Sequence, residues 1–405
     1  MKCPELLAPA GTLENLDVAL RYGADAVYQG LQGFSLRRAV KAEMTMASIR
    51  EAITRTHRLN KRYYLALNIL AHEKDLNELE QRLPELSTLA VDAVIVADPG
   101  IIRLIRAFGW NVPLHLSTQG TVVNREAVKF WKEQGIERVI LGRELNREAL
   151  LSIRKACPDV ELEIFVHGAM CMAYSGRCHL SHYLLDRDSN RGQCAQVCRW
   201  KFDIEKDNTD SVLDIEEDER GTYLLNAKDL CLAPVLSELT QLDCLKIEGR
   251  NKTSYYIGNV VRVYRWILDA LAQTAPPMII PQAWLDELNK VSHRPYSLGF
   301  FDDQNDLFGM ETPGYIKEYS MVGMIDRVEG CELVIQVRDT LKWGDSVDLL
   351  GVNPETDIAL VLSNMRLEGA ETVLEVAHPN QVIRITLPQT LSPDWQGALV
   401  RKRLV

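Results

Sequence analysis

Four cysteines lie between Met170 and Trp200, in a chain that contains nine. They are separated by six, fifteen and three residues: Cys171, Cys178, Cys194 and Cys198. Four thiolates from two short loops can complete a tetrahedral zinc shell or hold the corners of a 4Fe–4S cluster. Zinc sites usually space the ligands of a pair two to four residues apart, so the gap after Cys171 favours the iron–sulfur cluster. Zinc, a redox pair and unconnected thiols remain alternatives.

The other cysteines carry less chemistry. Cys231, in the sequence Lys-Asp-Leu-Cys, could replace one of the four as a ligand. Because free cysteine behaves as a small apolar side chain, we expect the remainder to be buried thiols: Cys3, Cys157, Cys244 and Cys331.

A Cys–His nucleophile is the competing chemistry. His167 lies four residues before Cys171, and His179 follows Cys178 directly. A thiol peptidase needs one thiolate, so four clustered cysteines are unnecessary for it. His167 is alternatively a base, a substrate ligand or a structural histidine.

The elements that position these residues form a repeating pattern. Eight short apolar segments, each followed by an amphipathic stretch, are expected to be strands: 5–10, 24–30, 63–70, 92–98, 113–119, 138–145, 162–169 and 244–250. Helical stretches lie between them, one opened by Thr12 and ended by Gly23, another opened by Asn124 and ended by Gly135. Eight strand-then-helix units predict an α/β fold, a TIM-type (β/α)₈ barrel. A doubly wound sheet is the alternative, but no GxGxxG motif follows an early strand.

Catalytic groups in such a barrel lie at the carboxyl ends of the strands. The polar residues at the expected strand ends are Asn68, Asp98, Ser117, Gln119, Arg143, His167, Glu248 and Arg250. The cysteine segment follows the seventh strand, so it is expected to be an enlarged loop on the catalytic face. We assign residues 1–275 to the barrel, with a four-cysteine loop at 170–200 and a β-hairpin insertion at 200–226. A linker with a short helix follows at 276–318, and period-two alternation predicts a small β-barrel at 319–405.

The chain has a net charge of −10, which argues against indiscriminate nucleic-acid binding. Three basic groups could still form local patches or be solvated surface charge: 37, 38 and 41; 55, 58, 61 and 62; and the tail 401–403. No signal-peptide h-region and no apolar run of spanning length is present, so a cytoplasmic protein without membrane contact is expected.

The segment from Glu161 to Ser181 resembles the signature of the collagenase-like peptidase (U-type) family. The matching residues are Glu163, Phe165, His167, Gly168, Cys171, Ser175, Gly176, Cys178 and Ser181. Five further stretches are similar to that family: PAG at 9–11, GADAVY at 23–28, GREL at 142–145, KIEGR at 246–250 and HRPYSLGF at 293–300.

Within the family, the chain looks most like the tRNA-hydroxylating branch, because Cys198 follows Cys194 so closely. That resemblance implies an enzyme forming 5-hydroxyuridine at the wobble position of the tRNA anticodon loop, without molecular oxygen and with prephenate as co-substrate. It also implies a 4Fe–4S cluster held by Cys171, Cys178, Cys194 and Cys198.

The residues at the strand ends can be given hypothetical roles in such a reaction. Arg143 and Arg250 are expected to bind the two carboxylates of prephenate, because a guanidinium pairs bidentately with a carboxylate. His167 and Glu248 are candidates for proton transfer, and a second group is expected to bind substrate: Asn68 and Gln119. The alternatives are a collagenase-like cysteine or metal peptidase, a ubiquinone-precursor hydroxylase and a zinc-stabilised RNA-binding module.

Overall fold

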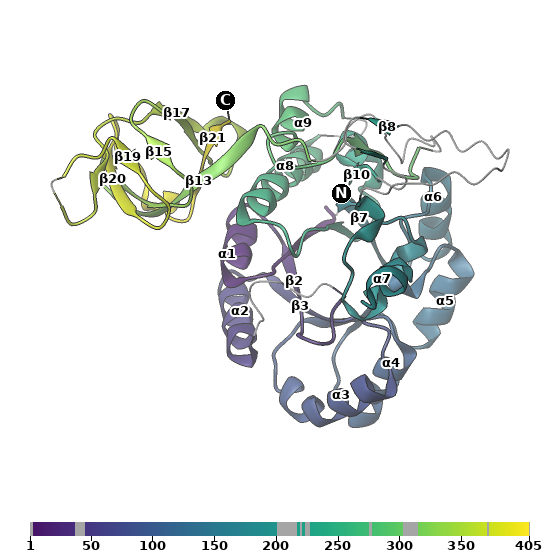
Figure 1. The fold of residues 1–405 in the computed structure, drawn as a ribbon. Coiled ribbons are helices and arrows are strands. Elements are labelled where there is room, and N and C mark those ends of the chain that lie inside the picture. Colours follow the sequence, from purple (N-terminus) through teal and green to yellow (C-terminus); the bar gives the residue numbers. More distant parts are fainter. Residues whose placement is uncertain are drawn as a thin grey trace.

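A computed structural model describes residues 3–36, 45–200, 217–218, 221–222, 227–274, 278–302, 315–370 and 372–404. A large α/β barrel and a smaller β domain lie side by side (Figure 1). The first of the three basic groups, at 37–41, falls outside the described residues. Among the described helices, none combines the length and the apolar content needed to cross a membrane.

Eight parallel strands close into a ring, with β11 pairing with both β1 and β7. All eight predicted strands are confirmed: β1 (Glu5–Pro9), β2 (Ala26–Gly30), β3 (Arg62–Leu67), β4 (Ala93–Val96), β5 (Leu114–Leu116), β6 (Arg138–Ile140), β7 (Glu161–Ala169) and β11 (Cys244–Ile247). Seven of them are shorter than expected, and β7 is one residue longer at its start. The chain is therefore a TIM-type barrel.

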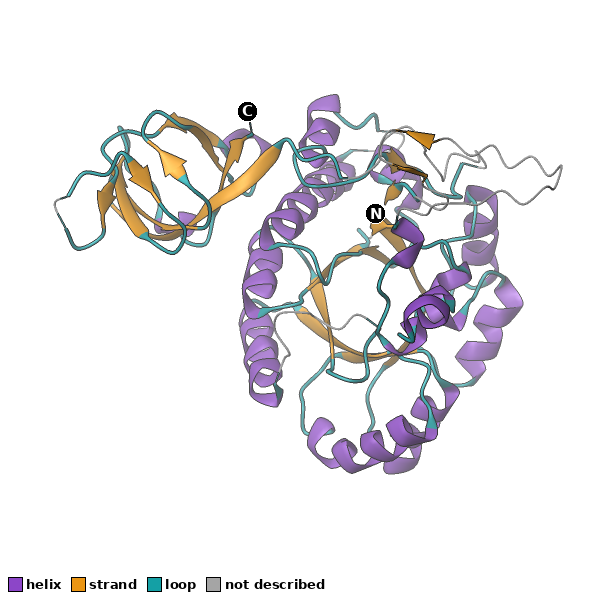
Figure 2. Ribbon diagram, viewed as in Figure 1, coloured by secondary structure: helices purple, strands orange, loops and turns teal. Residues whose placement is uncertain are grey.

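Helices surround the strands on the outside of the ring (Figure 2). They are α1 (Leu13–Arg21), α2 (Met46–Arg58), α3 (Glu73–Leu86), α4 (Pro99–Phe108), α5 (Arg125–Glu133), α6 (Arg147–Ala156) and α8 (Ser254–Gln273). The predicted caps are confirmed, since the Thr12 side chain accepts from the Asn15 amide and the Asn124 side chain accepts from the Ala127 amide.

The barrel interior contains a buried ionic layer. Arg138 pairs with Glu5 at 2.7 Å and with Glu163 at 3.3 Å, and Lys246 pairs with Glu163 at 2.8 Å. A buried charge is tolerated when it is paired and hydrogen-bonded. These ion pairs therefore connect β1, β6, β7 and β11 inside the barrel.

The segment between β7 and β11 is an insertion. It contains α7 (Leu180–Leu185), and the antiparallel pair β8 (Glu217–Asp218) and β9 (Gly221–Thr222), which is the described part of the predicted hairpin. Then β10 (Asp229–Cys231) pairs antiparallel with β7 and parallel with β12 (Tyr296–Ser297). The short helix expected in the linker is α9 (Gln282–Leu288).

The C-terminal strands form an antiparallel half-barrel in the order β17-β16-β21-β13-β14-β20-β18. Their bounds are β13 (Tyr319–Glu329), β14 (Glu332–Val337), β16 (Ser346–Leu349), β17 (Ile358–Val361), β18 (Arg366–Leu367), β20 (Val382–Thr386) and β21 (Leu399–Arg403). A separate pair, β15 (Leu341–Lys342) and β19 (Val376–Ala377), lies beside this sheet, and the unit has its own apolar core.

Buried charges join the half-barrel to the barrel. Arg401 is 2% exposed and pairs with Glu287 and with Asp348, while Arg262 pairs with Glu287 and with Asp357. The basic tail at 401–403 is therefore not a free surface patch, because its first residue is part of the contact between the two units.

The second basic group is also paired with carboxylates. Arg55 pairs with Asp17, and Lys61 bonds Asp25 at 3.0 Å. These cations on the outside of the barrel are thus largely neutralised.

Candidate functional site

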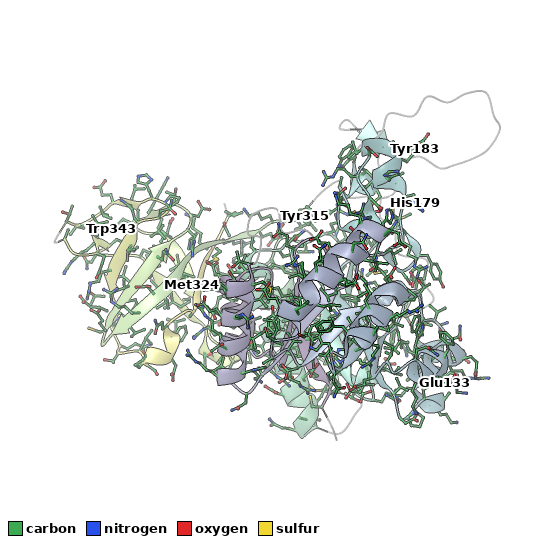
Figure 3. The ribbon with its side chains drawn as sticks, turned by 90° about the horizontal axis from the view of Figure 1, so that it is seen from below. Glu133, His179, Tyr183, Tyr315, Met324 and Trp343 are labelled. Atoms are coloured by element: carbon green, nitrogen blue, oxygen red, sulfur yellow. The ribbon has the colours of Figure 1, made fainter. Side chains whose placement is uncertain are left out.

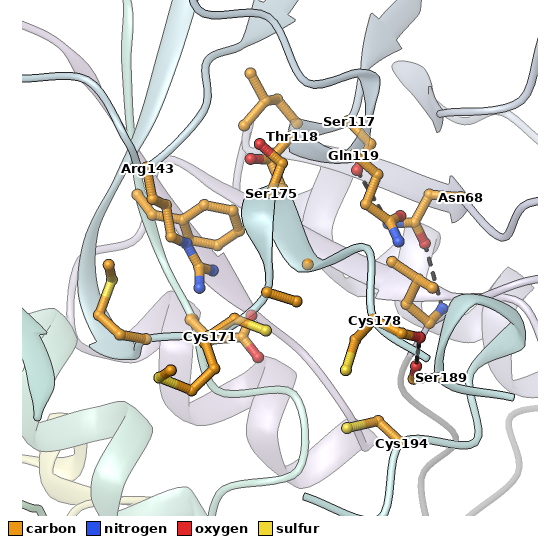
Figure 4. Close-up of a pocket in the computed structure, with 18 of the residues that line it drawn as sticks. Asn68, Ser117, Thr118, Gln119, Arg143, Cys171, Ser175, Cys178, Ser189 and Cys194 are labelled. Atoms are coloured by element: carbon orange, nitrogen blue, oxygen red, sulfur yellow. Dashed lines mark hydrogen bonds between the residues drawn. The ribbon is translucent and has the colours of Figure 1, made fainter. Parts of the chain in front are cut away.

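A cavity of about 140 Å³ lies at the carboxyl ends of the barrel strands, beneath the four-cysteine loop. Its wall takes residues from the ends of β3, β5, β6, β7 and β11 and from the loop itself. Six of the polar residues predicted at strand ends line it: Asn68, Ser117, Gln119, Arg143, Glu248 and Arg250. Figure 4 shows three of the cysteines beside this group.

All four clustered cysteines line this cavity, and none of the four forms a disulfide. The Cys178 sulfur accepts from the Leu180 amide at 3.3 Å, and the Cys194 sulfur accepts from the Gln196 amide at 3.4 Å. Backbone N–H donors to sulfur stabilise thiolates and tune iron–sulfur clusters. The four thiols, with these backbone donors, are therefore chemically suited to hold an iron–sulfur cluster. The described residues do not, as placed, bring three metal-binding side chains into one shell.

The cysteine loop is tied down at one end by Glu144. Its carboxylate accepts from the Ser175 hydroxyl at 3.0 Å and from the Ser175 amide. Ser175 is buried and has φ 49°, a left-handed conformation that needs such support. Arg177 donates to the Gln119 carbonyl at 2.6 and 2.9 Å, which fastens the loop to the end of β5.

A second anchor holds Cys178. The Asn190 side chain accepts from the Cys178 amide at 3.2 Å and donates to its carbonyl at 3.0 Å. Arg191 pairs with Asp75 of α3 at 2.6 Å. The loop is thus fixed to several strand ends and to one outer helix, and these contacts hold its cysteines at the cavity wall.

Three cations contribute to the cavity wall: Arg143, Lys246 and Arg250. The Arg143 guanidinium lies 4.0 Å from the centre of the Phe165 ring and donates to the Ala169 carbonyl at 2.9 Å. The Lys246 ammonium lies 4.4 Å from the Tyr28 ring. Aromatic faces help to orient these cations. Glu163 pairs with Lys246, so the groups on this wall best suited to bind carboxylates are the two guanidinium groups.

Two side-chain amides line the opposite part of the wall. Asn68 donates to the Ser117 hydroxyl at 3.2 Å. Gln119 is 1% exposed, and neither of its side-chain polar atoms has a hydrogen-bond partner among the described residues. Leaving a buried polar group unpaired costs about 1–3 kcal/mol. The Gln119 amide is therefore available to bond to a molecule in the cavity, either water or a ligand.

Glu248 brings a carboxylate to the same wall. Its Oε2 accepts from the Tyr28 hydroxyl at 3.3 Å. Burial, reinforced by the negative charge of Glu248, raises the pKa of Tyr28 well above its usual value, so this phenol stays protonated and can donate. Glu248 is therefore in position to hold or receive a proton at the cavity.

His167 lies behind the wall rather than on it. It is 1% exposed and surrounded by the rings of Tyr256, Tyr264 and Tyr296. Burial, with smaller contributions from nearby positive groups, lowers the pKa of His167 to about 3. Its carbonyl accepts from the Glu248 amide at 2.9 Å. Among the described residues on the cavity wall there is no histidine, so a Cys–His pair is not assembled there.

The other cysteines divide into two kinds. Cys231 is buried in β10 beside His167, away from the cavity wall, and burial raises the pKa of its thiol to about 11. Cys157 and Cys244 are buried as predicted, but Cys3 is only partly buried and Cys331 is exposed. The prediction for Cys331 was wrong because this residue lies in the turn between β13 and β14, where a period-two pattern does not report burial.

Sequence reasoning missed Lys246, Glu144 and Asn190 as parts of the site. Lys246 lies in β11, two residues before Glu248, which follows the end of that strand, and alternate residues of extended chain share a face. That spacing could have identified it. The contacts of Glu144 and Asn190 join segments far apart in the chain and have no such local pattern.

The model of Peptidase family U32 matches residues 11–309. A "tRNA hydroxylation protein P1" of Bacillus subtilis is 37% identical, over 97% of this chain and 94% of its own. A "tRNA hydroxylation protein P" of Escherichia coli is 34% identical, over 97% of this chain and 95% of its own. A protein named "Collagenase" from Porphyromonas gingivalis is 28% identical, over 96% of both chains.

Proposed function

The chain belongs to peptidase family U32, and from that premise we propose that it is a tRNA-modifying hydroxylase. The observation that carries the proposal is the set of four cysteines, none in a disulfide, on one cavity wall with three cations and the unpartnered Gln119 amide. This set suits a redox cofactor beside an anionic co-substrate. The relatives named for tRNA hydroxylation, similar over nearly their whole length, supply the substrate class.

In finer detail, the proposed product is 5-hydroxyuridine at the wobble position, made without molecular oxygen. Cys171, Cys178, Cys194 and Cys198 would hold a 4Fe–4S cluster, which supplies one-electron transfer when bound. Prephenate is the proposed co-substrate. It carries two carboxylates, and the guanidinium groups of Arg143 and Arg250 bind them.

The remaining residues position the nucleotide and its proton. A base reaches this cavity only after leaving its stack, which costs least in a single-stranded loop such as the anticodon loop. The amides of Asn68 and Gln119 bind the polar edge of that base, and Glu248 holds the proton. Burial keeps the His167 side chain neutral. The His167 backbone carbonyl accepts from the Glu248 amide, so His167 is a positioning residue here.

The test is mass spectrometry of tRNA nucleosides from a strain that lacks the gene. We expect loss of a uridine derivative that carries one extra oxygen, and its return when the wild-type gene is supplied. Unchanged nucleosides together with an altered quinone profile would replace this proposal with ubiquinone-precursor hydroxylation. Peptide cleavage by the purified protein, lost on Cys171→Ala, would favour the peptidase.

A further inference from the structure

A second cavity, of about 1190 Å³, opens between the barrel mouth and the C-terminal half-barrel. Its walls are the start of α1, the connection from β11 into α8, and the segment 315–321 that leads into β13. It meets the first cavity at three shared residues: Gln196, Glu248 and Arg250. This volume is larger than a small-molecule pocket usually needs. We call this feature the interdomain groove.

The interdomain groove is cationic in a chain of net charge −10. Four cations line it, Arg250, Lys252, Lys317 and Arg338, against two carboxylates, Glu14 and Glu248. Arg338 and Glu14 pair at 2.7 Å and neutralise each other. Within the part of the chain that the structure describes, no carboxylate pairs with the ammonium of Lys252 or Lys317, and Lys317 is exposed. Two positive charges therefore face the groove.

Aromatic rings hold Lys252 in place. Its ammonium lies 4.8 Å from the centre of the Tyr256 ring and 4.7 Å from that of the Tyr315 ring. Tyr315 is 47% exposed. Figure 3 places it between the half-barrel, marked by Trp343, and the cysteine loop, marked by Tyr183. A cation beside an exposed aromatic side chain is a combination that single-stranded nucleic-acid sites use.

The backbone adds a further positive field. The twenty-residue helix α8 begins in the groove, capped by Thr253, and Ser254, Tyr255 and Tyr256 of its first turn line the wall. No acidic residue lies in that turn. The amino end of a helix attracts phosphate through its free N–H groups and its dipole. Side chains and backbone thus favour the same kind of ligand.

We propose that the interdomain groove binds the phosphate backbone of the RNA strand next to the nucleotide that enters the first cavity. The inference rests on the proposed function and adds the path of the substrate to it. RNA is favoured over a small anion by the size of the groove, and its continuity with the first cavity lets one strand occupy both. The phosphate contacts are assigned to Lys252 and Lys317 and not to the basic tail 401–403, because Arg401 is buried.

The test compares two double variants of the full-length protein, purified without oxygen. Lys252→Ala/Lys317→Ala removes two charges from the groove. Lys129→Ala/Lys132→Ala removes two charges from α5, on the outside of the barrel. Binding of fluorescently labelled tRNA, taken from the strain that lacks the gene, is measured by anisotropy over a series of salt concentrations.

Each lost phosphate contact lowers the slope of log affinity against log salt by about 0.7 for a single strand. We expect the groove variant to bind more weakly and to lose about 1.4 from this slope, and the α5 variant to keep the wild-type slope. A wild-type slope in the groove variant would overturn the inference. Ultraviolet crosslinks between RNA and the peptide containing Tyr315 would support it, whereas crosslinks confined to β18 and β20 would overturn it.

The two proposals can fail separately. If the groove variant binds like wild type while the strain lacking the gene loses its hydroxylated nucleoside, the groove is wrong and the hydroxylase stands. If the nucleosides do not change but the groove variant loses its salt dependence, the groove binds RNA and the proposed reaction is wrong.

Discussion

Replacing Glu287 by glutamine is expected to loosen the C-terminal half-barrel from the barrel. The Glu287 carboxylate, in α9, pairs with Arg262 and Arg401 and with Lys290 at 2.8 Å. Burial alone would raise the pKa of Glu287, but the two guanidinium groups outweigh it and hold the pKa at about 2, against an ordinary value of 4.5. The difference corresponds to roughly 3 kcal/mol of stability at neutral pH. Because the folded-state pKa is the lower one, this contribution is complete above about pH 4.5 and disappears as the pH falls toward 2.

Urea unfolding at pH 7, followed by tryptophan fluorescence, measures the effect. Trp266 donates to the Val352 carbonyl across the contact at 2.6 Å, so its emission reports separation of the two units. Glu329→Gln is the matched control, because this carboxylate is exposed, and its unfolding midpoint should equal that of wild type. A Glu287→Gln variant that unfolds at the same urea concentration as the control would refute the reasoning.

Three further predictions concern the site. His167→Gln should reduce the loss of stability as the pH falls from 6.5 to about 3. In this range the histidine of the unfolded chain binds a proton, whereas buried His167 in the folded chain stays neutral. Urea unfolding midpoints across this range measure the effect. Gln119→Leu should stabilise the fold by about 1 kcal/mol, seen by calorimetry, while lowering the hydroxylated nucleoside in cells; unchanged stability would mean that its amide is already satisfied. Cys198→Ser should lower iron and sulfide per chain after purification without oxygen, and Cys231→Ser should not, because Cys231 lies away from the cavity; equal iron in both variants would exclude Cys198 as a ligand.

The barrel was predictable because its evidence is local. Each strand is a short apolar run, and caps such as Thr12 and Asn124 show where a helix begins. Polar residues at strand ends follow from the fold, and this rule correctly placed Gln119 and Arg250 on the cavity wall. The length of the chain between β7 and β11 likewise indicated an inserted loop.

Tertiary contacts decided the rest. His167 also follows an apolar run, yet the tyrosines of α8 enclose it. The tail residue Arg401 has the sequence of a surface cation, but three acidic side chains from other segments bury it. The residues near His167 and Arg401 in the sequence show no pattern that would predict that these side chains are buried. The interdomain groove is likewise invisible in sequence, since Lys252 and Lys317 lie in different parts of the chain.

The most direct test of the central claim is complementation of the strain that lacks the gene with single cysteine variants. Cys171 lines the first cavity, whereas Cys331 is exposed on the half-barrel. Mass spectrometry of tRNA nucleosides should find the hydroxylated uridine with wild type and Cys331→Ser and not with Cys171→Ser, at equal protein levels. A full amount of that nucleoside with Cys171→Ser would contradict the assignment of the cysteine-lined cavity as the place of hydroxylation.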